Sequence, residues 1–372
     1  WSGLVWSAWR PNELRRRLLM KILHVVTDND RRGAQVFARD LDAALRVRGH
    51  DSRRVALEPG RFGGLDSPVL STGGGRFSGL RQLRKEMSEA DVTVAHGSST
   101  LLACTLASLG SRKMPFVVRQ ISETRFWARG WQRRVRVQWY LRNARAVVAL
   151  AAGPAADLRD YLGVRDTKIF VVPNGVPIPD SERFAGRSQR RKEFGFGDDT
   201  VALAYVGALV PEKGVDRAIE ASGSLKAPLL IAGDGPIRQE LEYLAERAAP
   251  GLVTFVGAVD DPYEVFAAAD VMLLPSRGGD SMPAVLIEAG MAALPTVTTD
   301  VGAITDVVVN EVTGLVVDRD DDAGFIEAVS KMVGDDATRK AYSQAAQRHC
   351  TDHFSIEVIA QQYEQVLTEV RR

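Results

Sequence analysis

The sequence has little cysteine and no long apolar run, and these absences exclude several classes of protein. Cys104 and Cys350 are the two cysteines in 372 residues, so neither a disulfide framework nor a cysteine-based metal site is expected. No apolar run reaches the roughly 18–20 residues that a membrane span needs. The short apolar start at residues 4–9 is followed, not preceded, by arginines, which does not fit a secretory signal peptide. We therefore expect a cytoplasmic protein, with residues 1–19 as an extension outside the fold.

The motifs of common cofactors and metals are also missing. No G-x-G-x-x-G follows the first expected strand, which argues against a plain dinucleotide-binding protein. Asp28-Asn29-Asp30 has the D-x-D form that can hold a divalent metal with a nucleotide, but such a triplet in a polar loop is common by chance. We therefore predict no cofactor and no metal site.

Charge is divided unevenly along the chain. Residues 20–180 hold 26 Lys and Arg against 15 Asp and Glu, whereas residues 181–372 hold 18 against 31. A basic first half predicts an anionic partner, and halves of opposite charge would attract each other across a cleft. Two solvated surfaces of chance composition are the alternative.

Short apolar runs alternate with helical patterns from residue 20 onward. The first such unit is a strand at residues 21–27, a helix at 34–48 and a strand at 54–57. Repeated strand–loop–helix units predict an α/β fold with doubly wound parallel sheets, and the length suits two domains. We place the first domain at residues 20–180 and the second at 181–354, with a linker rich in Pro, Arg and Gly at 178–198.

The stretch from Leu273 to Gly302 carries the most chemical information. An apolar strand leads into a glycine pair, then Asp280, then an apolar helix that contains Glu288. Two carboxylates beside a helix start can accept hydrogen bonds from a polyhydroxy ligand, while the helix N–H groups bind its anionic part. In the alternative interpretation, Asp280 is only a helix cap and Glu288 a solvated acid.

Three further residues stand where ligands collect in open α/β sheets. Gly33 begins a helix, so its bare backbone could approach an anion. His96 ends an expected strand beside a glycine, although a lone histidine is usually structural. Lys213 precedes a helix and could reach a phosphate, or be a surface lysine.

The segment at residues 125–142 is dense in arginine and tryptophan. Trp127, Trp131, Val135 and Trp139 recur every four residues, which predicts an amphipathic helix with a basic face. We favour a core helix whose aromatic stripe faces the sheet. The alternative is peripheral docking on an anionic membrane or a lipid acceptor. Nucleic acid is not predicted as a partner, because no recognition motif accompanies the charge.

Several ordered motifs make the chain, from about Met20 to its end, similar to glycosyltransferase family 4, the retaining, sugar-nucleotide-dependent transferases. The matching features, in order, are a glycine loop at Gly33, the PNGV turn at 173–176, the G-x-L-x-x-x-K-G loop at 207–214, the GDGP turn at 233–236, an acidic E-x7-E-like pair at Asp280 and Glu288, Gly302, and Thr313-Gly314-Leu315. The resemblance implies the GT-B fold, in which two Rossmann-like domains face each other across a cleft. It also implies that the C-terminal helix, about residues 355–372, packs back on the first domain.

The resemblance assigns roles to the matching positions. Lys213 would contact the donor diphosphate, Gly33 would approach it from the first domain, Glu288 would hold the ribose, and Asp280 would contact the donor sugar. His96 would lie on the acceptor side. Backbone groups at Ser281, Met282, Pro283 and Ala284 would help to bind the donor. The family usually needs no metal, and the acceptor would be a glycan, a lipid-linked molecule or a small molecule.

Two departures from the family pattern concern the donor. Ala208 replaces the usual arginine of the G-R-L motif, so another cation must stabilise the leaving group, and Arg277 is the candidate. Asp280 replaces a glutamate and is one methylene shorter. A non-catalytic sugar-nucleotide or glycan binder and a sugar-nucleotide epimerase on the same fold therefore remain as alternatives.

Overall fold

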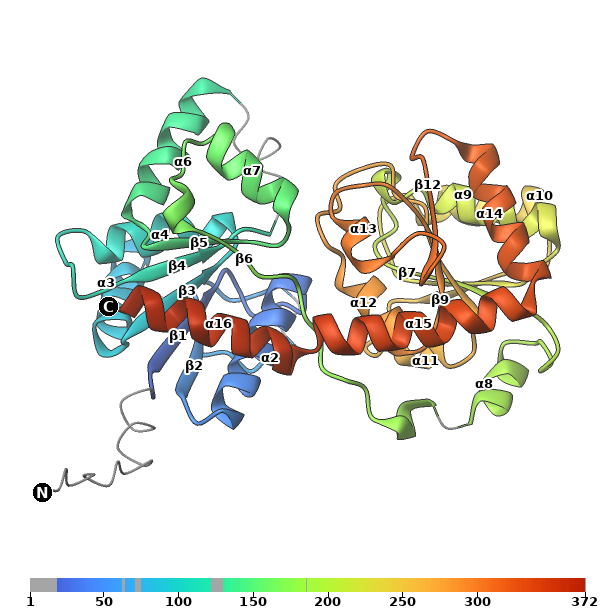
Figure 1. The fold of residues 1–372 in the computed structure, drawn as a ribbon, viewed down its shortest axis with the longest axis horizontal. Coiled ribbons are helices and arrows are strands. Elements are labelled where there is room, and N and C mark those ends of the chain that lie inside the picture. The colour runs from blue at the N-terminus through green and yellow to red at the C-terminus, as the bar shows by residue number, and fades with distance from the viewer. Residues whose placement is uncertain (1–18, 62–63, 71–74, 122–129, 185, 372) are drawn as a thin grey trace, which may run out of the picture. The chain divides into compact units, whose positions relative to one another are not determined.

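The computed structural model describes residues 19–61, 64–70, 75–121, 130–184 and 186–371 (Figure 1). The described residues form two compact units. The first unit contains residues up to Gln120, Gln138–Val148 and the chain from Ala360 onward, and the second contains Ile121–Val137 and Ala149–Ile359. The chain forms two six-stranded parallel sheets. The second lies wholly within the second unit, and the first lies in the first unit except for residues 149 and 169–171, which fall in the second.

The sheet of the first unit has the strand order β2-β1-β3-β4-β5-β6. Its strands are β1 (Lys21–Val26), β2 (Asp51–Ala56), β3 (Val92–His96), β4 (Phe116–Arg119), β5 (Ala146–Ala149) and β6 (Ile169–Val171). The helices of this part of the chain are α2 (Gly33–Val47), α3 (Gly75–Glu89), α4 (Ser98–Ser108), α6 (Trp131–Asn143), α7 (Ala152–Asp160) and the short η1 (Asp166–Lys168). The order reverses between β1 and β3, so the loops that follow these two strands meet at one edge of the sheet.

The sheet of the second unit has the order β12-β11-β10-β7-β8-β9. Its strands are β7 (Leu203–Val206), β8 (Leu229–Ala232), β9 (Val253–Gly257), β10 (Val271–Leu274), β11 (Thr296–Thr299) and β12 (Gly314–Val317). The accompanying helices are η2 (Ser181–Phe184), α8 (Arg187–Glu193), η3 (Pro211–Lys213), α9 (Val215–Leu225), α10 (Arg238–Ala248), α11 (Tyr263–Phe266), α12 (Ala284–Met291), α13 (Ile304–Val307), α14 (Asp322–Gly334) and α15 (Asp336–Phe354). The last helix, α16 (Ile356–Arg371), belongs to the first unit from Ala360 onward. In the second sheet the order reverses between β7 and β10.

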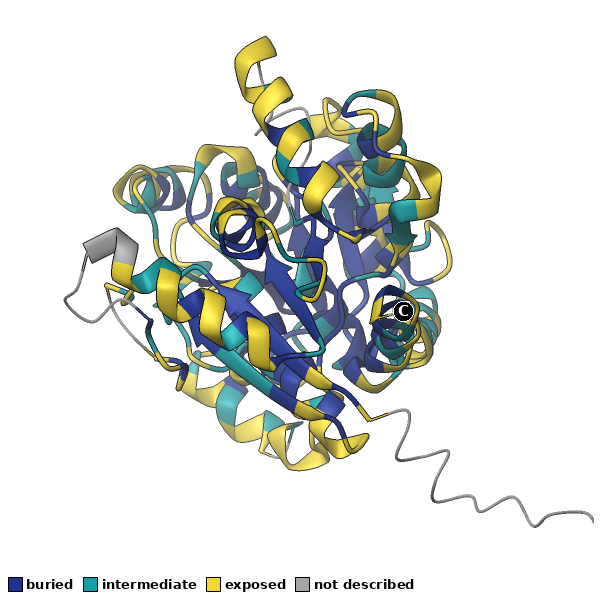
Figure 2. Ribbon diagram, turned by 90° about the vertical axis from the view of Figure 1, so that its left-hand side faces the viewer, coloured by how far each residue is buried: buried dark blue, intermediate teal, exposed yellow. Residues whose placement is uncertain are grey.

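Both sheets are covered on both faces, which explains why their strands are nearly continuous apolar runs. Every residue of β3, β4, β5, β7, β8, β10 and β11 is buried. Figure 2 shows the strands as dark blue interiors beneath helices whose outer faces are exposed. The two doubly wound α/β sheets predicted from the sequence are therefore confirmed.

The two compact units are divided at other residues than the predicted domains 20–180 and 181–354, and the domain limits stay predictions. Residues 149–180, expected in the first domain, belong to the second unit by their contacts. The C-terminal part of α16 belongs to the first unit, where Glu364 accepts hydrogen bonds from Arg48 (2.8 Å) and lies 3.1 Å from the His50 ring.

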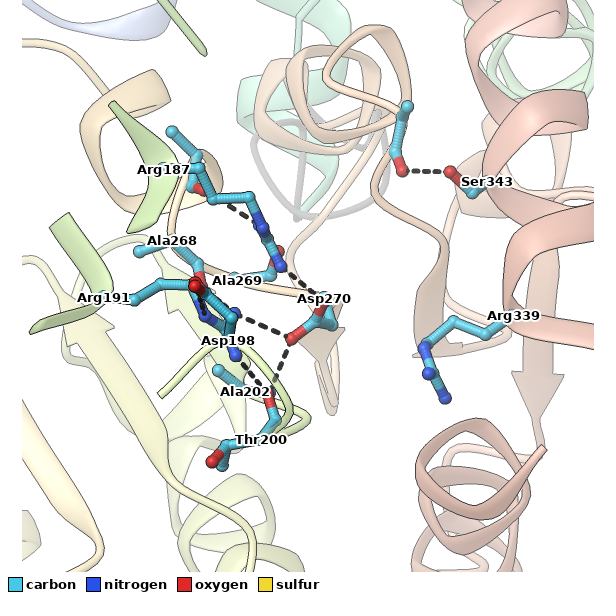
Figure 3. Close-up of polar contacts among 12 residues, drawn as sticks. Arg187, Arg191, Asp198, Thr200, Ala202, Ala268, Ala269, Asp270, Arg339 and Ser343 are labelled. Atoms are coloured by element: carbon cyan, nitrogen blue, oxygen red, sulfur yellow. Dashed lines mark hydrogen bonds and ion pairs between the residues drawn. The ribbon is translucent and has the colours of Figure 1, made fainter. Parts of the chain in front are cut away.

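The segment predicted as a linker, residues 178–198, is anchored rather than loose. It contains helices η2 and α8. Arg191, which is fully buried, donates to the carbonyl of Ala268 (2.7 Å) and pairs with Asp270 (3.0 Å). Arg187 pairs with the other oxygen of Asp270 at 2.6 Å (Figure 3). Two arginines that looked like solvated linker charges therefore fasten this segment to the start of β10.

Two expectations from composition can be compared with the structure. Both cysteines are free and buried, and burial raises the pKa of each thiol to about 12. In the described part of the chain, none of the helices is long and apolar enough to cross a membrane.

Candidate functional site

The strand order of the second sheet brings together two loops that are distant in sequence. The loop at 207–214 follows β7 and the loop at 275–283 follows β10, and these neighbouring strands end at the same edge of the sheet. This is the point where the strand order reverses, where open α/β sheets bind their ligands. Lys213 lies in the first loop and Asp280 in the second, 67 residues apart.

Lys213 and Asp280 form an ion pair at this edge. One oxygen of Asp280 accepts from the Lys213 ammonium, and the other accepts from the Ser276 hydroxyl at 2.5 Å. Asp280 is only 6% exposed, so its charge depends on these partners. The hydroxyl of Tyr205 donates to the carbonyl of Ala208 (2.8 Å), and burial together with the Asp280 carboxylate raises the pKa of Tyr205.

The interpretation of Asp280 as a helix cap is wrong. Helix α12 begins at Ala284, and its N-cap position is Pro283, where no side chain accepts a hydrogen bond from the helix. The first N–H groups of α12 are therefore not capped by a side chain. Proline has no N–H, so a donor contact at Pro283 would have to use another of its groups. The predicted donor contacts at residues 281–284 stay predictions.

Two motif glycines allow the loops to approach closely enough for the ion pair to form. Gly214 has a φ of +63°, and a Cβ there would lie 2.1 Å from the Pro275 carbonyl oxygen. Gly302 has a φ of +60°, and a Cβ there would lie 1.9 Å from the carbonyl oxygen of Asp280. These positions require glycine both for the backbone conformation and for the contact. The motif glycines therefore position Lys213 and Asp280.

The PNGV turn also holds the loop that contains Asp280. The Asn174 side chain donates to the Met282 carbonyl (3.3 Å), and its backbone N–H contacts the Met282 sulfur (3.1 Å). The Ser281 hydroxyl donates to the carbonyl of Ile121, and the N–H of Ala303 donates to the Ser281 carbonyl (2.6 Å). The sequence identified the turn but not this role of Asn174.

Arg277, the proposed substitute for the missing arginine at position 208, has a carboxylate partner of its own. Its guanidinium donates two hydrogen bonds to Asp216, at 2.6 and 2.7 Å. These bonds raise the pKa of Arg277. Among the described residues, Lys213 rather than Arg277 is the cation that contacts Asp280. Neither Ser276 nor Asp216 was singled out by the sequence, because their partners are set by the loop contacts.

Glu288 lies on α12, eight residues after Asp280. Its side chain is half-buried. Burial, together with the nearby Glu288 carboxylate, raises the pKa of the Tyr263 hydroxyl on α11. Glu288 is thus a half-buried residue and not the fully solvated acid of the alternative interpretation.

The predicted residues of the first unit lie at the corresponding edge of its sheet. Gly33 begins the 15-residue helix α2, no side chain caps that helix, and a Cβ at Gly33 would contact nothing within 4 Å. The start of α2 is therefore open. Asp28 accepts from Arg32 and from Gln35 (2.8 Å), so this acid of the D-x-D triplet already has two partners. Among the described residues, no three His, Cys, Asp or Glu side chains are grouped to hold a metal ion.

His96 lies at the end of β3, but its side chain is buried. It is 2% exposed, and its Nε2 lies 2.9 Å from the Nδ1 of His24. Burial lowers the pKa of His24 to about 4 and that of His96 well below its usual value. Arg119, also buried, lies with its guanidinium 3.7 Å from the centre of the Phe37 ring. This burial favours the structural interpretation of His96, and its acceptor-side role stays a prediction.

Two family models match the chain over most of its length. One, described as Glycosyltransferase Family 4, matches residues 31–178, and the other, Glycosyl transferases group 1, matches residues 186–349. These ranges contain all of the predicted site residues, from Gly33 and His96 to Lys213, Asp280 and Glu288.

Curated relatives resemble about three fifths of the chain. Glycogen synthase of Mycobacterium tuberculosis is 28% identical over 245 residues, which is 63% of this chain and 56% of the relative. A 2-deoxystreptamine glucosyltransferase of Streptomyces kanamyceticus is 28% identical over 252 residues, 63% of this chain and 64% of the relative. An exopolysaccharide phosphotransferase of Streptomyces coelicolor is 30% identical over 234 residues, 60% of this chain and 23% of the relative. The chain thus spans less than two thirds of the length of these relatives.

Solved structures of similar fold cover nearly the whole chain. HepE of Anabaena in complex with UDP-glucose has a TM-score of 0.81 at 18% identity, over 94% of this chain and 100% of that one. Sucrose-phosphate synthase of Thermosynechococcus elongatus has a TM-score of 0.77 at 18% identity, over 94% and 98%. At this identity the likeness shows the fold.

Proposed function

Because this chain belongs to glycosyltransferase family 4 and has the GT-B fold, we propose that it transfers a sugar from a nucleoside-diphosphate sugar with retention of anomeric configuration. The observation that carries the proposal is the Lys213–Asp280 pair at the edge of the second sheet where the strand order reverses. A cation for the diphosphate and a carboxylate for the sugar hydroxyls stand there side by side. Complexes of the structural neighbour HepE with UDP and UDP-glucose support a nucleotide-sugar donor.

In the proposed reaction, the chain's residues position the donor and stabilise charge. Lys213 contacts the diphosphate, Asp280 the donor-sugar hydroxyls and Glu288 the ribose, while the uncapped start of α2 at Gly33 contributes N–H groups. The bond from the anomeric carbon to the diphosphate oxygen breaks as the bond to the acceptor oxygen forms on the same face. The departing diphosphate takes the acceptor's proton. Catalysis then rests on orientation and charge stabilisation, without a protein nucleophile or a cofactor.

The acceptor is proposed only by class: a glycan, a lipid-linked molecule or a small molecule. The basic first half of the sequence supports an acceptor with anionic groups. The donor is likewise proposed only by class, as a nucleoside-diphosphate sugar, because Asp280 and Ala208 both depart from the family pattern at positions that bind the donor.

A donor panel, measured by release of nucleoside diphosphate, tests the proposal. One donor should be turned over faster in the presence of an acceptor, and NMR of the product should show the donor's anomeric configuration. Lys213→Ala should abolish release, whereas Lys192→Ala, at an exposed lysine of α8, should not. An inverted product would refute retention, and unchanged release by Lys213→Ala would refute the role of Lys213.

The same panel separates the two alternatives. An epimer that appears from donor alone, without acceptor, would indicate an epimerase. Calorimetric binding of a donor without turnover, across a range of acceptors, would indicate a binding protein. His96→Ala should lower turnover more than donor affinity if His96 lies on the acceptor side, and a loss confined to donor affinity would contradict that role.

A further inference from the structure

Helix α6 exposes its large apolar side chains instead of burying them. Trp131, Val135 and Trp139 are 74%, 56% and 43% exposed, whereas Val137 and Leu141 of the same helix are buried. The favoured expectation, a core helix with its aromatic stripe against the sheet, is therefore wrong for these residues. The exposed stripe has no function in the proposed reaction, so it needs a separate explanation.

Arginines share this exposed face of α6. Arg136 and Arg142 are exposed, and at 3.6 residues per turn Arg142 falls between the directions of Trp131 and Val135. The face is thus mixed, with aromatic and cationic side chains interleaved. Trp127, the fourth member of the predicted stripe, lies outside the described residues.

A basic hollow adjoins the C-terminal end of α6 in the first unit. It has a volume of about 620 Å³ and lies between the ends of α4 and α6. Its lining includes three arginines, Arg112, Arg142 and Arg145, and all of its lining residues are described and none is acidic. Leu109, also in the lining, is 41% exposed.

Helix α4 adds further exposed apolar side chains next to the hollow. Leu102 and Leu106 lie one turn apart on this helix and are 43% and 38% exposed, and Leu109 follows directly after its end. The hollow is made by the segments that precede β4 and β5, so it lies at the amino-terminal edge of the first sheet. Gly33 and His96 lie at the opposite, carboxyl-terminal edge. A partner bound at the hollow would therefore not cover that edge of the sheet.

We propose that this face of α4 and α6 docks on an anionic membrane surface. Tryptophan is favoured at the membrane–water interface, and arginine is attracted to lipid phosphates. An anionic bilayer therefore provides an apolar layer for the tryptophans and phosphates for the arginines within a few ångströms of each other. An apolar protein patch would have to bury the interleaved guanidiniums without phosphate partners, which is costly. Nucleic acid would offer phosphates but no apolar layer for the tryptophans and leucines.

Vesicle binding by the full-length protein tests this proposal. Binding should be strong to vesicles of phosphatidylglycerol and phosphatidylcholine in equal parts, weak to phosphatidylcholine alone, and reduced by salt. Replacing Arg112 or Arg145 by alanine should lower the partition coefficient about fivefold each, and the double variant by about the product. Trp131→Ser with Trp139→Ser should lower it at least as much.

A matched control is available on the second unit. Tyr243 of α10 is 63% exposed and has the guanidinium of Arg247 5.7 Å from its ring centre. Tyr243→Ser and Arg247→Ala remove an exposed aromatic–arginine pair from another surface and should leave vesicle binding unchanged. Circular dichroism and thermal unfolding of each variant should match the wild type, so that lost binding reports the surface and not the fold.

Three results would overturn the proposal. The first is a failure to bind anionic vesicles, and the second is equal binding to neutral and anionic vesicles. The third is a Trp131/Trp139 double variant that binds as well as the wild type. Donor turnover in solution should stay the same in all of these variants, because none of the substituted residues is among those proposed to bind the donor. Failure of membrane binding would therefore leave the proposed transfer reaction untouched.

Discussion

The ion pair between Lys213 and Asp280 can be tested by a double-mutant cycle. Lys213→Met removes the charge and keeps the aliphatic stem, and Asp280→Asn removes the charge and keeps the shape. The Asp280 side chain is 7% exposed and that of Lys213 22%, so either single change leaves a mostly buried charge without its partner. We expect each single variant to lose about 2 kcal/mol of unfolding free energy, below the cost for a fully buried pair.

The double variant should be about as stable as either single variant. Both partners are then neutral, so the coupling free energy should be about 2 kcal/mol. In thermal unfolding, each single change should lower the midpoint by about 4–8 °C. The surface pair Arg238–Glu242 on α10 (2.8 Å), changed to Met and Gln, is the control and should show no measurable coupling.

Activity should follow the opposite pattern. In the proposed reaction Lys213 acts on the diphosphate and Asp280 on the sugar, so their losses should multiply. We expect Lys213→Met to lower turnover by about 10²–10³ and Asp280→Asn by about tenfold to a hundredfold. Release of nucleoside diphosphate measures both. Additive stability changes would show that the pair does not exist in solution, and a double variant as active as the weaker single variant would refute separate roles.

Three further predictions concern the fold around the sites. Gly302→Ala should cost about 2 kcal/mol or more, because its Cβ would meet the Asp280 carbonyl at a φ of +60°, whereas Gly334→Ala, with nothing within 4 Å, should be nearly neutral in urea unfolding. Because the pKa of His24 is lowered to about 4, the protein should lose stability as pH falls from about 6.5 to 4, where only the unfolded chain takes up this proton, and the loss should approach about 3 kcal/mol. His24→Gln should therefore reduce the pH dependence of the urea midpoint, and the remaining dependence should include that of His96, whose pKa is also lowered. Arg191→Met should lower the unfolding free energy by about 2–3 kcal/mol in the same assay, because its hydrogen bonds to Asp270 and to the Ala268 carbonyl are lost while Arg187 still pairs with Asp270; a loss below about 1 kcal/mol would contradict the anchoring of α8.

Local pattern was enough to predict the two doubly wound sheets and the positions of the site loops. Apolar runs of strand length, each followed by a glycine-containing loop and a helix, can form few other architectures. The family motifs then marked Gly33, Lys213, Asp280 and Glu288. Side-chain direction was harder to predict. The same pattern did not decide whether Asp280 caps a helix or binds a ligand, or whether His96 is buried in the core or faces the acceptor.

What the sequence by itself determined is the order of these loops along the chain, because each is defined by neighbouring residues. Only the tertiary structure decided which loops meet. Lys213 contacts Asp280 because β7 pairs with β10, across 67 residues and two intervening strands. In the same way, the packing of β1 against β3 buried His96 against His24, and the rotation of α6 turned Trp131 outward. Such contacts depend on strand pairing and helix packing between distant segments, which local periodicity does not specify.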